Sequence, residues 1–396
     1  MSGRILLAIV IGSLAGIIFQ EQAGEWGKPT KLVIIAIKAL ALPLILFAIT
    51  HVLMTAQVQG AKVGKLARLL LTNTAMAIGI GLLLANVIQP GVHSPKPAVE
   101  AGDSVASGSL LGMLEDSIPK SFLGPLGDQG KPLSVIVIAI VLGLALRTQR
   151  QNPAFATVEG LVKLALATLT VILKWVVELL PLAVLGIIAS KVGTGSTKQF
   201  AALGWFVVTV CAGLLLQSAY YLLRVWRGSW VTPLQMLQGC RDALLTAFST
   251  ASSTCTMPIT YTSLREKVGL REDSANLGAM VGTNFNNDGT ALYEAVAALF
   301  VAQMVGISLG LPAQLVIVLT SMLAAMGAAG IPEGGAATLA LVLSSVNLPV
   351  EYVALLLTVD WFVDRCRTMV NVMGDCAVSC ILDGKTRGSE YPAAPI

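Results

Sequence analysis

The chain is 396 residues long, and 55% of its residues are hydrophobic while only 12% are charged. A soluble globular protein carries roughly 25% charged residues, and the mean hydropathy of +0.79 indicates a polytopic membrane protein instead. The net charge of +4 does not indicate a nucleic-acid partner, because the basic residues form no block and cytoplasmic loops explain the excess. The six cysteines form no CxxC pair and show no metal-ligand spacing.

The first half of the chain contains apolar segments that are long enough, or nearly so, to cross a hydrocarbon core of about 30 Å. In chain order they are residues 4–20, 31–56, 67–89, 133–147, 161–190 and 200–224. The first resembles a signal peptide but lacks a small-residue cleavage site, so we expect a retained helix. Lysine and arginine follow the second, fourth and sixth segments, which predicts a cell-membrane protein with cytoplasmic N- and C-termini.

Two segments of the second half are apolar but interrupted. Residues 242–262 contain several serines and threonines and Pro258, and residues 320–350 contain the sequence GAAGIPEGG between two apolar arms too short to cross alone. Irregular backbone at membrane depth is tolerated only where it is buried in protein or lines a cavity. The pair therefore predicts two re-entrant hairpins, a pattern typical of transporter sites made from inverted repeats.

Five polar residues lie at helical spacing near the end of the chain: Asp360, Asp364, Arg367, Asn371 and Asp375. At roughly 100° per residue they share one face of a helix. An ionised side chain costs at least about 2.5 kcal/mol at the centre of a membrane helix, so such a stripe must face a protein interior or a wet cavity. One cation, three anions and a carboxamide suit a ligand that carries both signs of charge, together with cations.

Four motifs follow one another in the second half: FSTASSTCTMPIT, NFNNDGTALYEAVAALFVAQ, GAAGIPEGG and VDWFVDRCRTMVNVMGD. In this order they resemble the first hairpin, seventh helix, second hairpin and eighth helix of the dicarboxylate/amino acid:cation symporter family. That family includes the animal excitatory amino acid transporters and prokaryotic glutamate and aspartate symporters. The resemblance implies an all-α membrane fold of eight transmembrane helices plus two re-entrant helical hairpins, built from inverted repeats and assembled as a homotrimer in membrane lipid.

The resemblance also implies how the chain is divided. The expected parts are scaffold helices (1–66), the third helix of a transport domain (67–91), an outer loop with the fourth to sixth helices (92–232), a transport core (233–385) and a cytoplasmic tail (386–396). Within the third part, the fourth and fifth helices belong to the scaffold and the sixth to the transport domain.

Carried over by position, the resemblance implies a site for an acidic amino acid. Arg367 would pair with the side-chain carboxylate, which a guanidinium fork suits, and Asp364 would accept from the α-amino group. The other expected contributors are Thr368 and the backbone near Ile331 at the amino group, Asn371, Ser252 and Ser253 at the α-carboxylate, and Thr290 and Gly335 at the side-chain end. Polar packing between helices is the alternative reading of any one of them alone.

Sodium requires hard oxygen ligands, some of them carbonyls freed where a helix unwinds, and the run from Asn286 to Gly289 has the composition of such a break. The resemblance implies three sodium sites. One would use Asp375 with carbonyls at Gly282, Asn286 and Asn371, and a second would use Asp288 and Asn286 with Thr72, Asn73 and Thr74. The third would use carbonyls near Asn284, Gly327 and Ala328. Leu70 and Asn73 stand where archaeal members have tyrosine and threonine, and Asn287 replaces the usual methionine. The number of sodium ions therefore stays open.

Glu294 and Arg365 occupy positions typical of the proton-coupled, potassium-countertransporting animal members, and Ala251 replaces an arginine of the archaeal pattern. A buried glutamate favours its neutral form, which gives a proton a physical reason to bind there. The alternative is that Glu294 pairs permanently with Arg365 or another cation as a structural bridge.

We therefore predict a secondary active transporter, not an enzyme, that imports glutamate or aspartate with sodium and binds no covalent cofactor. A C4-dicarboxylate symporter is disfavoured by Asp364, a neutral amino acid exchanger by Arg367, and an anion-conducting channel is the alternative from another class. A membrane serine hydrolase is disfavoured because Ser252 and Ser253 lie in no GxSxG motif and both histidines, His51 and His93, are far from them in sequence.

Overall fold

The computed structural model describes residues 2–28, 30–55, 62–93, 119, 121–122, 124–127, 132–195, 198–327 and 335–387. Within these ranges the chain is helical and contains no strand, which agrees with the all-α prediction. The elements of the first half are α1 (Ser2–Phe19), η1 (Gln20–Gly27), α2 (Thr30–Thr55), α3 (Lys62–Ile88), η2 (Pro90–His93), η3 (Gly124–Leu126), α5 (Pro132–Thr148), α6 (Phe155–Glu178), α7 (Leu180–Gly193) and α8 (Lys198–Gly228).

The second half is divided into shorter helices. They are α9 (Pro233–Gly239), α10 (Arg241–Thr250), α11 (Ser253–Thr262), η4 (Ser263–Val268), α12 (Glu272–Asn276), η5 (Leu277–Val281), α13 (Gly282–Phe285), α14 (Asp288–Val305), α15 (Leu311–Gly327), α16 (Gly335–Ser345) and α17 (Tyr352–Asp383). Helix α17 is an exception, since it has 32 residues and contains the whole predicted polar stripe without a break.

Five helical stretches of the described chain are long and apolar enough to cross a membrane: Gly3–Gly27, Ile35–Thr55, Gly64–His93, Phe155–Gly193 and Ala201–Gly228. They agree with five of the expected segments, whereas the fourth, Ser134–Thr148, is a shorter apolar helix. The expected segment 161–190 is divided into α6 and α7 at Leu179. Pro181 explains the division, because proline has no N–H and its ring clashes with the preceding helical turn.

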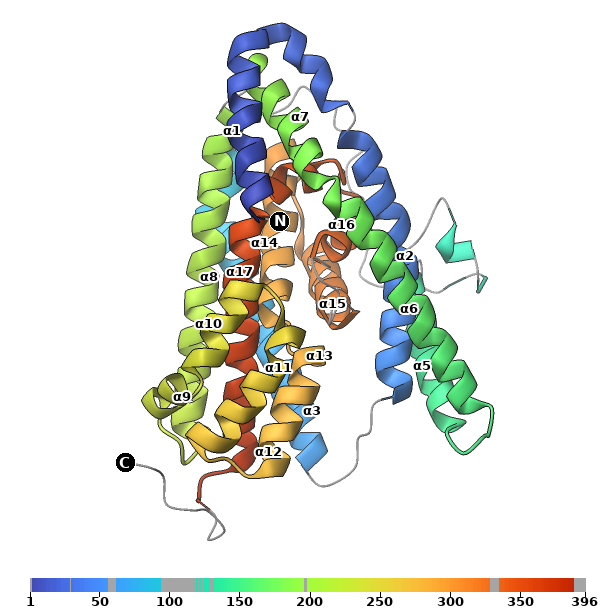
Figure 1. The fold of residues 1–396 in the computed structure, drawn as a ribbon, viewed down its shortest axis with the longest axis vertical. Helices are drawn as coiled ribbons and strands as arrows, with labels where there is room; N and C mark the ends of the chain where they lie inside the picture. Colours follow the sequence, from blue (N-terminus) through green and yellow to red (C-terminus); the bar gives the residue numbers. More distant parts are fainter. Residues whose placement is uncertain are drawn as a thin grey trace.

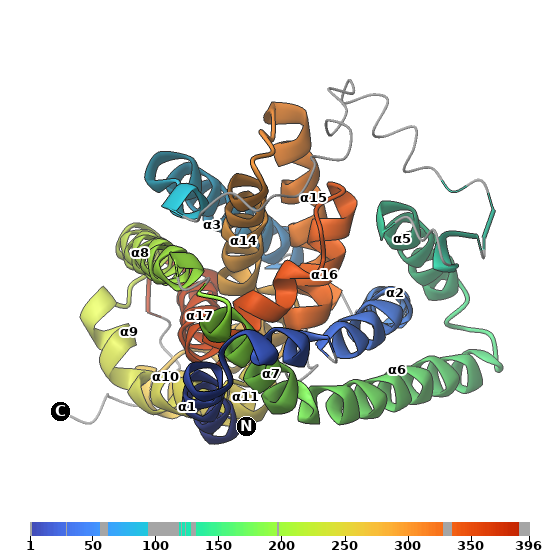
Figure 2. The same ribbon diagram turned by 90° about the horizontal axis from the view of Figure 1, so that it is seen from above.

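The outer helices of the molecule pack in two groups. In one, α1 runs beside α7, and in the other α2 lies against α5 and α6 (Figures 1 and 2). The remaining helices gather around α17, which contacts α8, α10 and α14, while α3 lies along α14 and α8. Viewed from above in Figure 2, α5 and α6 lie on the opposite side of α2 from α8 and α17.

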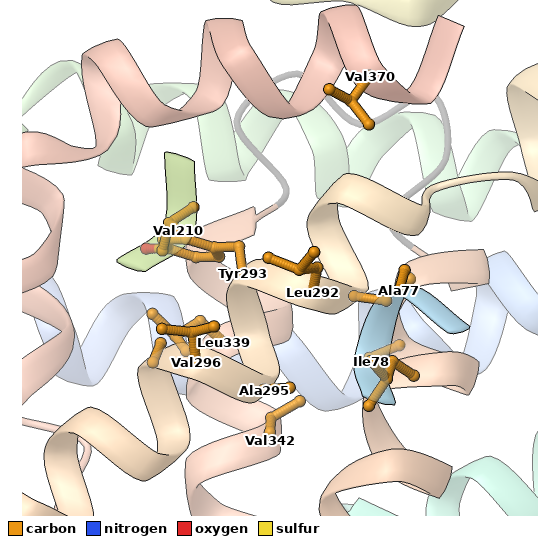
Figure 3. Packing of buried hydrophobic residues seen from close by; sticks show 14 of the residues in the cluster. Ala77, Ile78, Val210, Leu292, Tyr293, Ala295, Val296, Leu339, Val342 and Val370 are labelled. Carbon is orange, nitrogen blue, oxygen red and sulfur yellow. The ribbon is translucent and has the colours of Figure 1, made fainter. Parts of the chain in front are cut away.

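Helix α14 is at the centre of the packing. Every residue in it is buried except Gln303 and Val305. Figure 3 shows Leu292 beside Ala77 of α3 and Val296 beside Leu339 of α16. Because α14 is rich in alanine, its neighbours approach closely, and dispersion between packed side chains is the main attraction between helices in lipid.

At the positions of the two predicted hairpins the structure has two pairs of helices in contact. Helices α10 and α11 pack against each other around a turn in which Ala251 is left-handed, at φ 51° and ψ 34°, and Ser252 caps α11 by accepting from Cys255 N at 3.2 Å. The second pair, α15 and α16, are also in contact. Its first arm begins at Leu311, earlier than the expected 320, and most of the GAAGIPEGG tip lies outside the described residues.

The predicted break in the seventh helix is confirmed. Helix α13 ends at Phe285, and α14 begins at Asp288. Between them Asn286 and Asn287 have ψ angles of 60° and 48°, well away from helical values. Backbone groups near the break are therefore released from the helical ladder in the interior of the protein.

The carboxylate of Asp383 ties three segments together at the end of α17. It accepts from Trp230 Nε1 at 2.7 Å and from the backbone N–H of Arg271 at 3.1 Å, and it forms a 3.0 Å ion pair with Arg271 Nε. The Asp383 side chain is 0% exposed, whereas the side chain of its partner Arg271 is 39% exposed.

We expect Asp383→Ala to destabilise the fold, since a buried donor left without an acceptor costs about 1–3 kcal/mol. The midpoint of thermal unfolding in detergent should fall clearly. Asp242→Ala is the matched control, because Asp242 pairs with Lys267 at the surface, where 57% of the carboxylate side chain is exposed, and such pairs contribute about 1 kcal/mol or less. Equal effects of the two substitutions would contradict this role for Asp383.

Candidate functional site

Arg367 is buried in α17 between two carboxylates of the same helix. Its Nη2 donates to Asp364 Oδ1 at 2.7 Å and lies 3.2 Å from Asp360 Oδ1. Its guanidinium carbon stands 4.1 Å from the centroid of the Tyr293 ring. Only 1% of the arginine side chain is exposed, so these neighbours replace water in stabilising its charge.

The Arg367 cluster has unused hydrogen-bonding capacity. Among the described residues, Nε and Nη1 of Arg367 have no acceptor, although a guanidinium carries five N–H donors. A Cβ atom on Gly335 would lie 2.8 Å from Nη2, so the backbone at the start of α16 closes on the guanidinium. Two carboxylates against one guanidinium leave one negative charge uncompensated. The cluster thus suits a ligand with an anionic acceptor for Arg367 and a cationic donor for the aspartates.

Asn371 lies one turn beyond Arg367 and connects α17 to the first turn of α14. Its Oδ1 accepts from the backbone N–H of Gly289 at 2.7 Å. Its Nδ2 donates to Thr290 Oγ1 at 3.4 Å and to Asn287 Oδ1 at 3.3 Å. These contacts bring Asn371 and Thr290 together, and Thr368 in the same region donates to the carbonyl of Asp364 at 2.8 Å.

Asp375 lies a further turn along α17, facing the break. Its Oδ1 accepts from Asn286 Nδ2 at 3.1 Å, and the same amide reaches the carbonyl of Asn371 at 3.3 Å. Gly282 packs directly against the carboxylate, where a Cβ atom would clash. Asn284 contacts none of these groups in the described structure and donates to Met280 O at 2.8 Å.

Asp288 is the first residue of α14 and is fully buried. Its Oδ1 accepts from Thr74 Oγ1 of α3 at 2.6 Å, and its Oδ2 accepts from the Tyr221 hydroxyl of α8. The other two expected contributors from the third helix face elsewhere. Thr72 and Asn73 both accept hydrogen bonds from Arg224 Nη1, the former at 3.1 Å.

The tip of the first hairpin is fixed to α17 by Arg365. Its Nη1 donates to the carbonyls of Phe248 and Ser249, at 3.0 and 2.5 Å, near the end of α10. Ser252 and Ser253 follow at the start of α11 and are partly exposed. Cations are favourable at a helix C-terminus, so Arg365 stabilises this turn of the hairpin.

Glu294 is buried in α14, two turns after Asp288. Neither of its carboxylate oxygens meets hydrogen-bond geometry with a described residue, although the hydroxyls of Thr338 and Ser321 lie close to it. No ion pair joins it to Arg365 within the described chain. The structural-bridge alternative therefore finds no support at Arg365. Ile331 and Ala328, the remaining expected contributors, lie outside the described residues.

The amino-acid sequence that forms this arrangement matches a known family. The sequence profile of the sodium:dicarboxylate symporter family matches residues 1–385. The chain belongs to this family. Family membership and the apolar helices together make it a membrane protein of a transporter family.

Individual members of the symporter family are also similar over most of the chain. An excitatory amino acid transporter of Onchocerca volvulus is 30% identical over 93% of this chain and 86% of its own length. One of Caenorhabditis elegans is 30% identical over 93% and 84%. The excitatory amino acid transporter 3 of Mus musculus is 36% identical, over 64% of this chain and 48% of its own length.

Sequence reasoning missed two aromatic residues of the polar centre around α14 and α17. Tyr293 lies against Arg367, and its place one turn after Thr290 on a helix was the available signal. Tyr221 reaches Asp288 from α8. Its neighbour Gln217 is a polar residue in an otherwise apolar span, and such residues mark interhelical contacts or ion pathways.

Gly289→Ala should weaken the junction between α14 and α17, because a Cβ atom there would lie 2.7 Å from the carbonyl oxygen of Arg367 and 3.0 Å from Asn371 Oδ1. Overpacking of this kind costs about 1–3 kcal/mol, and we expect a lower thermal midpoint together with reduced ligand affinity.

Gly79→Ala on α3 is the matched control for this substitution, since nothing lies within 4 Å of the added atom. Alanine is favoured over glycine in a helix by about 1 kcal/mol, so the control should be neutral or stabilising. A Gly289→Ala protein that equals the control in both measurements would contradict the close approach.

Proposed function

We propose that this protein is a sodium-coupled symporter that imports an acidic amino acid, glutamate or aspartate, across the cell membrane. The proposed topology is eight transmembrane helices and two re-entrant hairpins, with both termini in the cytoplasm. Its relatives of the same family are named excitatory amino acid transporters, which supports this substrate class.

The observation that carries the proposal is the buried cluster of Arg367 with Asp360 and Asp364. An acidic amino acid offers a side-chain carboxylate to the guanidinium, whose Nε and Nη1 find no acceptor among the described residues. Its α-amino group is a cationic donor for Asp364, whose exposed fraction is 19%. A charge-assisted contact between guanidinium and carboxylate is stronger in a dry pocket than in water.

Sodium supplies the remaining positive charge. An amino acid with two carboxylates and one ammonium group adds net negative charge to a cluster that already has one negative charge in excess. The buried carboxylates Asp375 and Asp288 border the helix break one to two turns away from the cluster. Oxygen ligands at such a break suit sodium, and cations bound there favour the anionic substrate electrostatically.

Transport then requires the loaded site to cross the membrane. The two-part contact pattern supports an elevator in which α3, α8 and the helices from α9 to α17 form the transport domain. The scaffold would consist of α1, α2, α5, α6 and α7, assembled as a homotrimer through faces that contact lipid or neighbouring subunits. The hairpins open and close the site on its two sides.

Glu294 is the proposed proton carrier, with return of the empty transporter coupled to potassium. It is buried one turn from Thr290 and beside Tyr293, on the helix that lines the Arg367 cluster. A buried carboxylate that lacks a permanent counterion gains by taking a proton.

The test of substrate class is uptake of radiolabelled glutamate, aspartate, succinate and alanine into proteoliposomes, with and without external sodium. We expect sodium-dependent uptake of the acidic amino acids, lost by about 100-fold or more in Arg367→Cys because breaking a buried charge contact costs about 2–5 kcal/mol. The variant should gain uptake of alanine or serine.

Arg227→Cys is the control for Arg367→Cys, since this arginine is exposed near the end of α8. Unchanged aspartate and glutamate uptake in Arg367→Cys would rule out the proposed role. Preference for succinate over both amino acids would instead favour a dicarboxylate symporter.

Glu294→Gln should separate two modes of transport. The amide fixes the side chain in a neutral form, so the loaded carrier still crosses and exchange of internal for external substrate survives. Net uptake driven by internal potassium should collapse, because the empty carrier cannot release its proton. Glu351→Gln, an exposed glutamate before α17, should retain both modes. Loss of exchange together with net uptake would indicate a structural role, and wild-type uptake indifferent to potassium would reject potassium coupling alone.

A further inference from the structure

Helix α8 places polar side chains next to Asp288. The Tyr221 hydroxyl donates to Asp288 Oδ2, and the carboxamide of Gln217, one turn earlier, lies against the same hydroxyl. Gln217 Nε2 donates to the backbone carbonyl of Asn73 at 3.3 Å. Both α8 side chains are buried, so they face the polar interior although the helix otherwise reads as apolar.

Helix α3 contributes fewer oxygen ligands near Asp288 than its sequence suggests. Leu70 has no side-chain oxygen. The side-chain oxygens of Thr72 and Asn73 accept from Arg224. Only Thr74 reaches Asp288, at 2.6 Å. A cation at Asp288 would therefore need ligands from another element.

Two buried side-chain oxygens, one beside Tyr221 on α8 and one at the helix break two residues before Asp288, have no donor among the described residues. Within the described chain, Gln217 Oε1 and Asn286 Oδ1 accept no hydrogen bond, and their residues are only 0% and 1% exposed. The Asn286 amide and the Tyr221 hydroxyl both border Gly374, where a Cβ atom would meet them. A buried polar atom without a partner costs about 1–3 kcal/mol, unless a cation or a donor occupies the space beside it.

We propose that α8 supplies Gln217 and Tyr221 as ligands of a sodium ion at Asp288, together with Thr74 and Asn286. This inference rests on the proposed sodium-coupled function and specifies one of its ion sites. The hydroxyls of Tyr221 and Thr74 donate to Asp288 and keep lone pairs for a cation. All five groups offer hard oxygens, which suit an alkali cation rather than a soft metal.

The alternative to a sodium ion is that the Arg224 guanidinium neutralises the Asp288 carboxylate. Its guanidinium donates to Thr72 and Asn73 and lies over the Tyr220 ring, 5.4 Å from the centroid. No ion pair with Asp288 is present in the described structure. The arginine thus joins α3 to α8 through Thr72 and the buried Asn73, and it leaves Asp288 without an ion pair among the described residues.

The test counts the sodium ions taken up with substrate. The dissociation constant of aspartate or glutamate for the purified protein is measured calorimetrically over about a hundredfold range of sodium, with choline as replacement. The slope of its logarithm against that of sodium reports the coupled ions. We expect Tyr221→Phe and Gln217→Leu each to lower the slope by about one, or to raise the half-saturating sodium concentration about tenfold.

Tyr220→Phe is the matched control, because it removes a neighbouring hydroxyl that does not face Asp288, and it should leave the slope unchanged. Equal slopes in Tyr221→Phe, Gln217→Leu and Tyr220→Phe would overturn the proposal. If Arg224→Gln raises the slope against sodium by about one, the proposal is also overturned. The result would mean that Arg224, and not a sodium ion, neutralises Asp288 in the wild-type protein.

A second measurement uses sodium alone. Sodium chloride should raise the thermal unfolding midpoint of the wild-type protein more than potassium or choline chloride does. The extra rise in the midpoint caused by sodium should be smaller in Gln217→Leu. This variant alone tests whether α8 supplies ligands if Tyr221→Phe fails to fold. Substrate binding that is indifferent to sodium in the wild-type protein would defeat the symport proposal itself, whereas sodium dependence with unaltered variants defeats only the α8 site.

Discussion

Burial of the Arg367 guanidinium is the constraint on which the rest of the structure depends. A charge removed from water must be paired and hydrogen-bonded, and here Asp364, Asp360 and the Tyr293 ring provide this environment. Because Tyr293 belongs to α14, α14 and α17 must align so that the ring covers the guanidinium. The packing of α3, α8 and α16 around α14 then encloses the pair.

Much of this arrangement was predictable from sequence, because the signals are local. The helical spacing of Asp360, Asp364, Arg367, Asn371 and Asp375 predicts one face, and all five occur on α17. The run from Asn286 to Gly289 predicts a break, and the helix is interrupted there. The polar interruption at residues 249–254 predicts a hairpin turn, which Ala251 forms. Each inference depends on residues that lie within about four helical turns of one another.

Other contacts had no local signal. Thr74 and Tyr221 meet at Asp288 from separate helices, so only the packing of α3 and α8 against α14 reveals the pair. Thr72 and Asn73 reach Arg224 instead. Successive residues of a helix face directions about 100° apart, so Thr74 can contact Asp288 while the two residues before it do not. The division of residues 161–190 was missed because hydropathy continues unbroken through Leu179, while Pro181 alone alters the backbone.

The glycines between α14, α13 and α17 have a mechanical consequence. A Cβ atom on Gly289 would clash with the backbone carbonyl of Arg367, one on Gly282 with the Asp375 carboxylate, and one on Gly374 of α17 with the Asn286 amide. Arg367 and Asp375 are eight residues apart on one unbroken helix, a rise of about 12 Å. Because these approaches leave no room even for a methyl group, the helices cannot move closer together or slide past one another at these glycines without clashes. The distance between the arginine and the carboxylate is therefore fixed like that between two points on a rigid rod, and any movement of one end displaces the other by the same amount.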